Sequence, residues 1–312
     1  MLKRLRASHP ILYCILAIAL FWAVMSQGGQ LLVLLLTWAG PAVAAPFVQE
    51  NFLLQAAGDL LGFAAALVLL WRTGQLWVFT KRGCGFWDGL LVGMTPFVMV
   101  CLGLAVNVGA PILPEDAVLK APWRIAVFFV TMFLIGLTEE SMFRGVVGQT
   151  LLLHFGPSRT GVWKACLLSG ALFGALHLTN LVSSAPLGVL IQCCMAGGLG
   201  VLYGAIYFRT GNLWVVIALH ALQDTAALVN TGLYDGVAST SEVVSSYDPV
   251  CWWGCCSIWC PPSFCCGAAV CHWWRPTGVW KTPRIDFCTR METAHGGLAG
   301  PAVGGLLRGA QM

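Results

Sequence analysis

Charged side chains are scarce in this sequence. Only 10% of its 312 residues are Asp, Glu, Lys or Arg, whereas 58% are hydrophobic. Because a soluble domain carries about a quarter charged residues, this composition excludes an ordinary soluble protein and predicts a membrane protein. The formal net charge of +4 is small, and the basic residues form no long run, which excludes nucleic acid as a partner. The expected surroundings of the chain are the lipid bilayer.

Long apolar runs recur up to residue 230. Crossing roughly 30 Å of hydrocarbon takes about 20 residues, and runs near that length predict an all-α fold, a polytopic membrane helix bundle of about seven spans. The predicted spans are 11–38, 52–71, 86–108, 123–141, 162–182, 186–207 and 213–230. The sequence SQGGQ interrupts the first of them, which leaves open whether it forms one helix or two.

Lys and Arg gather on one side of the bundle if the first run crosses the membrane once. That side holds the amino end, the 72–85 loop, the 142–164 segment and Arg209, and the positive-inside rule makes it cytoplasmic. The opposite side has only Lys120 and Arg124 as cations. We therefore predict an integral, multi-pass protein of a bacterial plasma membrane with a cytoplasmic N-terminus. A cleaved signal peptide is disfavoured, because further spans follow the first run.

We expect three parts in the chain. Residues 1–84 hold N-terminal membrane helices and a basic loop, 85–230 hold the remaining spans, and 231–312 form an atypical tail rich in Cys, Trp, Pro and Gly. Eight of the 14 cysteines lie within 251–288. Three interpretations of the tail stay open: a disordered extension, a cysteine-rich metal or disulfide module, and a frameshifted translation that replaced a final membrane helix. We favour the frameshift.

Ionisable side chains are rare inside the predicted spans. Each costs several kcal/mol there unless it is paired, neutralised or facing water, so each is a candidate functional residue. The set is Asp59 in the second span, Glu139 and Glu140 at the end of the fourth, His177 in the fifth, and His220 with Asp224 in the seventh. We expect Asp59 to be an interhelical hydrogen-bond partner, with cavity lining as the alternative.

The two adjacent glutamates leave a helix in different directions. Glu139 and Glu140 are about 100° apart around the axis, so we expect that they do not both face one pocket. Arg144 lies four residues after Glu140, which predicts an i,i+4 ion pair and leaves Glu139 as the free carboxylate. The simpler alternative is that both glutamates are solvated at the membrane surface.

Imidazoles occur in two other spans. His220 and Asp224 are four residues apart and project from one helix face, where they can bind one target or Asp224 can fix the tautomer of His220. A lone histidine such as His177 is more often a packed side chain than a ligand. Taken together with Glu139, however, these groups can supply a general base and can orient water or bind a metal.

The depths of these residues conflict if the spans are placed by hydropathy alone. His177 lies some 20 Å or more along a helix from residue 162, whereas Glu139 lies near the inner end of its own span. The depths agree if the fifth helix starts later, or if 142–164 folds back as a membrane-embedded elbow. The sequence GPSRTG at 156–161 is a plausible turn.

Three short motifs occur in a specific order. EESMFRG, FGALH and HALQD resemble the EExxxR, FxxxH and HxxxN/D motifs of the CPBP family of intramembrane metalloproteases, the CAAX-protease and bacteriocin-processing (Abi) family. The segment GLGVLYGAIYFRTGNLW is similar to the usual lead-in of the third motif. The resemblance extends over 85–230 and implies a catalytic membrane core with an intramembrane polar cavity that opens to the cytosol.

The resemblance also implies roles for individual residues. Glu139 is expected to activate the water that cleaves a peptide bond, and His177 to orient that water. His220 with Asp224, which stands where many members have asparagine, is expected to stabilise the oxyanion. Glu140 is expected to assist, and Arg144 and Phe173 to support the site.

A metal is a further expectation. Two histidines and a carboxylate are normal ligands of an open catalytic zinc site, so zinc or another divalent metal at His177, His220 and Asp224 is predicted. A metal-free glutamate mechanism uses the same residues and stays open.

These observations predict an intramembrane endopeptidase that acts on a protein or peptide substrate, prenylated if the host prenylates proteins. The alternatives are a non-catalytic membrane scaffold or a bacteriocin self-immunity protein of the same fold, and a small transporter with a proton or metal relay. We find no convincing internal repeat, which weighs against the transporter.

Overall fold

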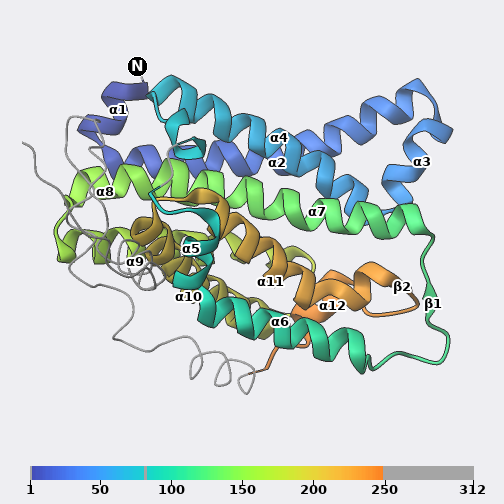
Figure 1. The fold of residues 1–312 in the computed structure, drawn as a ribbon. Coiled ribbons are helices and arrows are strands. Elements are labelled where there is room, and N and C mark those ends of the chain that lie inside the picture. The colour runs from blue at the N-terminus through green and yellow to red at the C-terminus, as the bar shows by residue number, and fades with distance from the viewer. Residues whose placement is uncertain (1, 81–82, 249–312) are drawn as a thin grey trace, which may run out of the picture.

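A computed structural model describes residues 2–80 and 83–248, and helices make up most of this part of the chain (Figure 1). The predicted all-α membrane bundle is confirmed. The proposed origins of the tail concern residues 249–312, which lie outside the described residues, whereas 231–248 contain a short strand and a short helix.

The elements are α1 (Leu2–Ser8), α2 (Pro10–Ala39), α3 (Pro41–Gln49), α4 (Asn51–Thr73), η1 (Leu76–Phe79), α5 (Phe86–Val92), α6 (Met94–Gly109), β1 (Val118–Leu119), α7 (Pro122–Glu140), η2 (Ser141–Gly148), α8 (Gln149–Phe155), α9 (Arg159–Leu176), η3 (His177–Val182), α10 (Pro186–Thr210), α11 (Leu213–Leu233), β2 (Tyr234–Asp235) and α12 (Thr240–Ser245).

The number of spans agrees with the prediction. In the described part of the chain, six helices are long and apolar enough to cross a membrane, and a seventh span results if α5 and α6, which meet at a bend of 86°, are counted as one. The first run forms a single helix of 30 residues, which answers the question left open by SQGGQ. The third run, by contrast, is broken at Gly93.

Local sequence signals place the ends of the spans. Pro10, Pro122 and Pro186 stand in the first turn of α2, α7 and α10, where a missing N–H leaves no hydrogen bond unmade. Gly74 and Gly211 follow α4 and α10 with φ of 77° and 61°, a left-handed conformation that glycine adopts without a steric cost.

The fourth span is longer than hydropathy suggested. The helix runs without a break from Pro122 to Phe155, 34 residues, and its central part, η2, has π-helical hydrogen bonding. Glu139 is therefore near the middle of the span, and the expectation that it lies at the span's end was wrong. Apolar patterning missed the continuation because the span's polar residues are buried inside the protein and do not face water.

The longer helix resolves the conflict of depths. Glu139 is 16 residues before the end at Phe155, about 24 Å, and His177 is 18 residues after the start of α9, about 27 Å. Neither an elbow at 142–164 nor a late start of the fifth helix is needed. The predicted turn is present, with Gly156 at φ 82° and Ser158 accepting a hydrogen bond from the Gly161 N–H.

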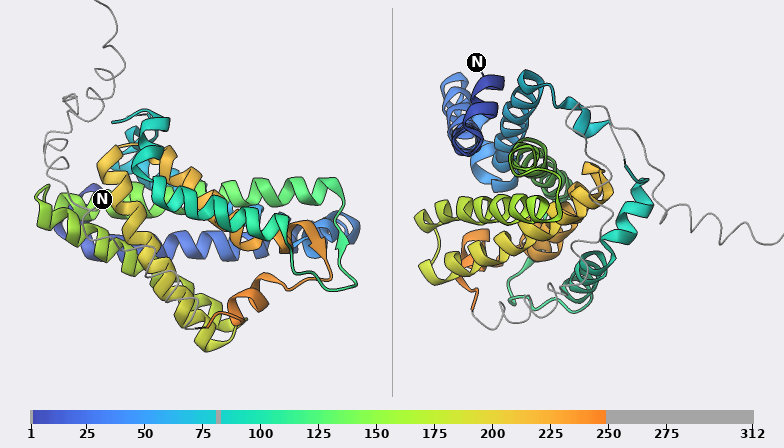
Figure 2. Two further views of the ribbon diagram at one scale, coloured as in Figure 1. Left: turned by 60° about the horizontal axis from the view of Figure 1, so that its bottom comes forward. Right: turned by 90° about the vertical axis from the view of Figure 1, so that its left-hand side faces the viewer.

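The α7–η2–α8 helix runs through the middle of the bundle (Figure 2). Helices α4 and α11 both pack against α7, and α9 packs against α10. Helix α1, the α8–α9 turn and the α10–α11 turn lie at one end of the bundle, whereas α3, β1, β2 and α12 lie at the other (Figure 1). The strands pair antiparallel, with Val118 opposite Asp235 and Leu119 opposite Tyr234.

A close approach of two helices holds α11 in place. A Cβ added at Gly136 of α7 would lie 2.8 Å from the Ile217 carbonyl oxygen and 3.0 Å from the Ala221 nitrogen, one residue beyond His220. Small residues permit such contacts between membrane helices. Helices α7 and α11 can therefore approach each other this closely only because Gly136 has no side chain.

We predict that Gly136→Ala destabilises the protein by about 1–3 kcal/mol, because the methyl group overpacks the α7–α11 crossing. Thermal unfolding in detergent measures the effect. Gly103→Ala on α6 is the matched control, since a Cβ there meets nothing within 4 Å in the described structure. Equal unfolding temperatures for the two variants would contradict the close approach.

Candidate active site

Glu140 lies at the centre of a buried polar network. Its side chain is fully buried, with Oε2 2.8 Å from Arg144 Nε and Oε1 2.7 Å from His220 Nδ1. The predicted i,i+4 ion pair with Arg144 is thus confirmed. The contact with His220 was not predicted, because it joins residues 80 positions apart. A carboxylate can only accept, so Nδ1 of His220 is the donor.

Arg144 is buried among aromatic rings. Its guanidinium carbon lies 5.2 Å from the centre of the Phe173 ring and 5.7 Å from that of Tyr203, and Nη2 donates to the Gly200 carbonyl at 3.3 Å. A cation over a ring face is held by the ring quadrupole. Phe173 also meets the rings of both His177 and His220 edge to face. Phe173 is therefore in contact with Arg144, His177 and His220.

His220 Nε2 faces two further carboxylates. Glu139 Oε2 is 3.6 Å away and Asp224 Oδ2 is 3.5 Å away. The expectation that His220 and Asp224 meet on one helix face is confirmed. The two glutamates differ as the helix geometry indicated, because Glu140 is buried behind His220 while Glu139 borders a cavity. They nevertheless reach the same imidazole, through different nitrogens.

His177 is the first residue of η3, where α9 tightens into a 3₁₀ turn. Its Nδ1 is 3.0 Å from the Phe173 carbonyl oxygen, which can only accept a hydrogen bond. Nδ1 therefore carries a proton, and in the neutral ring Nε2 is left as an acceptor. His177 and Glu139 border the same cavity.

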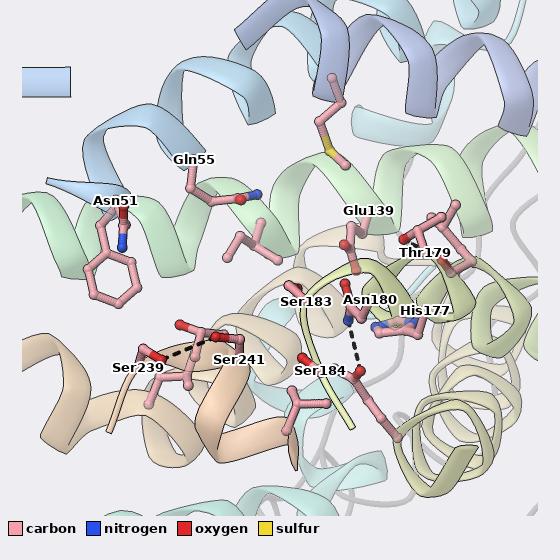
Figure 3. Close-up of a pocket in the computed structure, with 18 of the residues that line it drawn as sticks. Asn51, Gln55, Glu139, His177, Thr179, Asn180, Ser183, Ser184, Ser239 and Ser241 are labelled. Atoms are coloured by element: carbon pink, nitrogen blue, oxygen red, sulfur yellow. Dashed lines mark hydrogen bonds between the residues drawn. The ribbon is translucent and has the colours of Figure 1, made fainter. Parts of the chain in front are cut away.

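The cavity has a volume of about 500 Å³ and lies between α2, α4, α7, η3 and α12. Glu139 projects toward it from α7, and His177 and Asn180 lie close by (Figure 3). Several other lining side chains, among them Asn51, Gln55 and Ser183, are polar and uncharged, and the rest, such as Trp22 and Leu176, are apolar. The predicted intramembrane polar cavity is present, and it brings together the free carboxylate and one imidazole.

Asp59 lies behind Glu139. Its side chain is 1% exposed, and Oδ1 accepts a hydrogen bond from Gln55 of the same helix at 3.0 Å. The bond between helices is made by its backbone, because Thr138 Oγ1 donates to the Asp59 carbonyl at 3.0 Å. The expectation of an interhelical bond is therefore met by the main chain and not by the carboxylate. Gln55, which connects Asp59 to the cavity, was not singled out from the sequence.

The donor groups do not form a metal centre in this arrangement. Among residues 2–80 and 83–248, no three His, Cys, Asp or Glu side chains are grouped so that they could hold a metal ion. Both nitrogens of His220 face carboxylate oxygens, and Nδ1 of His177 is bonded to a carbonyl. The zinc site at His177, His220 and Asp224 stays a prediction, and no chemical step is derived through it below.

The π-helical stretch η2 begins directly after Glu140 and contains Arg144. π-Helical stretches are rare in proteins, and many of those that occur are found at functional sites. Its eight residues are all buried, and Ser169 of α9 donates to the Phe143 carbonyl within it. No pattern in SMFRGVVG distinguishes this hydrogen bonding from that of an ordinary α-helix, so the sequence did not reveal it.

The fold and site together define a polytopic membrane helix bundle with a Glu–His–Asp cluster embedded halfway along its helices. Comparison with protein families identifies the segment more closely. Residues 121–226 match the family described as type II CAAX prenyl endopeptidase, Rce1-like. The resemblance seen in the three motifs is thereby confirmed over this segment, which contains every predicted catalytic residue from Glu139 to Asp224. The chain has no match among curated proteins or solved structures.

Breaking the Glu140–Arg144 pair should destabilise the protein strongly. We predict that Glu140→Gln and Arg144→Met each cost about 3–5 kcal/mol, because each leaves a buried charge unpaired. The double variant should lose less than the sum of the two. Unfolding in detergent measures all three, and Asp235→Asn, which alters a half-exposed ion pair, is the control with an expected loss of about 0–1 kcal/mol. Strictly additive losses would mean that the two side chains do not interact.

Proposed function

We propose that the protein is an intramembrane endopeptidase in which Glu139 activates a water molecule against a peptide bond. The observation that carries this proposal is the meeting of Glu139 and His177 at one cavity inside the bundle. A membrane scaffold has no need of a carboxylate and an imidazole at this depth, where an ionisable group is costly. The family match supports a CAAX-type endopeptidase fold around these residues.

The reaction requires a base and a place for the proton. Glu139 takes a proton from water as the oxygen attacks the carbonyl carbon, and His177 Nε2 accepts the second hydrogen bond of that water and thereby orients it. The tetrahedral oxyanion then collapses with cleavage of the C–N bond. Glu139 returns its proton to the leaving nitrogen, which gives an amine and a carboxylic acid, and the acid then loses its proton to solvent water.

His220 is the proposed group for the oxyanion. Glu140 holds its Nδ1 end, so Nε2 points toward Glu139, where the substrate carbonyl would bind. A protonated Nε2 can donate to the developing negative charge, which is the role of an oxyanion-hole donor. Asp224, as a carboxylate, cannot donate. We assign it the orientation of Nε2, in place of the direct oxyanion contact that an asparagine could make.

The substrate is proposed to be a protein or peptide. A prenylated carboxyl-terminal sequence is the substrate class that the family's description suggests. A non-catalytic scaffold or self-immunity protein of the same fold is the alternative, and the loss of one carboxylate distinguishes it from an enzyme.

We predict that Glu139→Gln lowers cleavage by about 100-fold or more, the usual contribution of a general base, while insertion and unfolding temperature stay unchanged. The measurement compares new peptide termini, by mass spectrometry, in membranes that contain the unmodified chain or the variant at matched levels. Glu115→Gln in the exposed loop before β1 is the control. If both chains produce the same termini, the scaffold is favoured.

Metal dependence has its own test. Because the described donors do not converge on a metal position, we expect cleavage to persist after treatment with a strong chelator. Elemental analysis of the purified full-length protein is the second readout. Stoichiometric zinc that is lost in a His177→Ala variant would show that the arrangement closes around a metal.

A further inference from the structure

The cavity occupies only one half of the bundle. The residues of α7 that line it are Met132, Ile135 and Glu139, and in the described part of the chain no lining residue comes from the helix beyond Glu139. The lining residues of α4, Asn51 to Gln55, belong to its first two turns. Glu139 is thus at the inner end of a space that extends toward the starts of α4 and α7.

That end of the bundle is the one opposite the N-terminus. Helix α4 begins there after α3, and the lining side chains Ser239 and Ser241 come from the start of α12, next to β2 (Figure 1). Ser183, which follows η3, is exposed and also borders the cavity. Helix α1 and the turn at Gly156 lie at the far end, where no described residue contributes to the cavity.

The two ends differ in their cations. The end with α1 carries seven Lys or Arg residues in the described part of the chain: Lys3, Arg4, Arg6, Arg72, Arg159, Lys164 and Arg209. The cavity end carries Lys120 and Arg124, and both are held by the protein. Arg124 pairs with Glu50 and Asp235, and Lys120 Nζ donates to the Thr231 carbonyl at 2.8 Å. An excess of Lys and Arg near the span ends marks the cytoplasmic side.

Two expectations drawn from the sequence are therefore incompatible in this fold. A cytoplasmic N-terminus follows from the distribution of cations, whereas a cavity open to the cytosol follows from the family resemblance. The cavity and the N-terminus are at opposite ends, so only one of these expectations can hold. The charge argument concerns this chain's own residues, and it places the cavity end outside the cytoplasm.

From this geometry we propose that the active-site cavity receives its substrate from the non-cytoplasmic side of the membrane. The substrate class is then an extended segment of a membrane or exported protein on that side, and not a prenylated cytosolic terminus. That the bound molecule is a substrate rests on the proposed function, but the orientation of the cavity does not depend on it.

The lining fits a peptide main chain. Asn51, Gln55, Asn180 and Gln192 offer amide donors and acceptors without net charge, and Asn180 Nδ2 already donates to Gln192 Oε1 at 2.8 Å. Side-chain amides of this kind pair with both the N–H and the C=O groups of an extended chain. Glu139 is the one acidic side chain among the lining residues of the described structure.

Cysteine labelling decides the orientation. Ser183→Cys places a thiol at the cavity, and Thr160→Cys, equally exposed and next to Arg159, is the matched control at the other end. Right-side-out and inverted membrane vesicles containing the full chain are treated with a charged, membrane-impermeant maleimide. Mass spectrometry of the peptide around each site separates the new thiols from the native cysteines.

We expect Ser183→Cys to be modified in right-side-out vesicles and to lose this labelling in inverted ones, with the opposite result for Thr160→Cys. Modification of Ser183→Cys only in inverted vesicles overturns the inference. In that case Glu139-dependent cleavage can still be observed, on cytosolic segments. The expected labelling together with an absence of Glu139-dependent termini would leave the orientation standing and refute the endopeptidase.

Discussion

The buried carboxylate of Glu140 is the interaction on which the rest of the site depends. It binds Arg144 with one oxygen and His220 with the other, so it connects η2 to α11 within the membrane. A buried charge is tolerated when it is paired and hydrogen-bonded, and its loss leaves the partner uncompensated. Arg144 is in turn held by two aromatic rings and by the Gly200 carbonyl of α10. One carboxylate thereby fixes the position of the imidazole that faces Glu139.

The continuous helix from Pro122 to Phe155 is what allows this network to form at mid-depth. Adjacent glutamates on it point about 100° apart. Glu140 is thereby directed toward the protein interior, where it holds Arg144 and His220, and Glu139 is directed toward the cavity, where we propose that it acts as the base. The close crossing at Gly136 brings α11 near enough for His220 to lie between the two glutamates. A single helical turn of α7 and one of α11 therefore account for most of the polar contacts of the site.

Patterns in the sequence were sufficient for the class of fold, the number of spans, the Glu140–Arg144 pair and the meeting of His220 with Asp224, because these depend on composition or on spacing within one helix. The length of the fourth span was not predictable in this way, since its second half is buried by protein and carries polar residues such as Gln149 and Thr150. The contact of Glu140 with His220 depends on how two distant helices cross. Tertiary packing also determines the π-helical stretch, the position of Asp59 behind Glu139 and the end of the bundle at which the cavity lies. Periodicity identifies which side chains share a helix face, but it does not indicate which helices those faces meet.

Charged side chains join the helices at the cavity end of the bundle. Arg124 of α7 binds Glu50 at the start of α4 and Asp235 of β2, and Lys120 binds the last turn of α11, so the same three helices that surround the site are joined at this end. Its few cations are thus committed to holding the bundle together. The cations of the other end include exposed side chains such as Lys3 and Arg4, which are free to contact water and anionic headgroups. The exposed cations and the charged contacts that join the helices therefore lie at opposite ends of the bundle, and the cavity lies at the end where Arg124 joins α7 to α4 and β2.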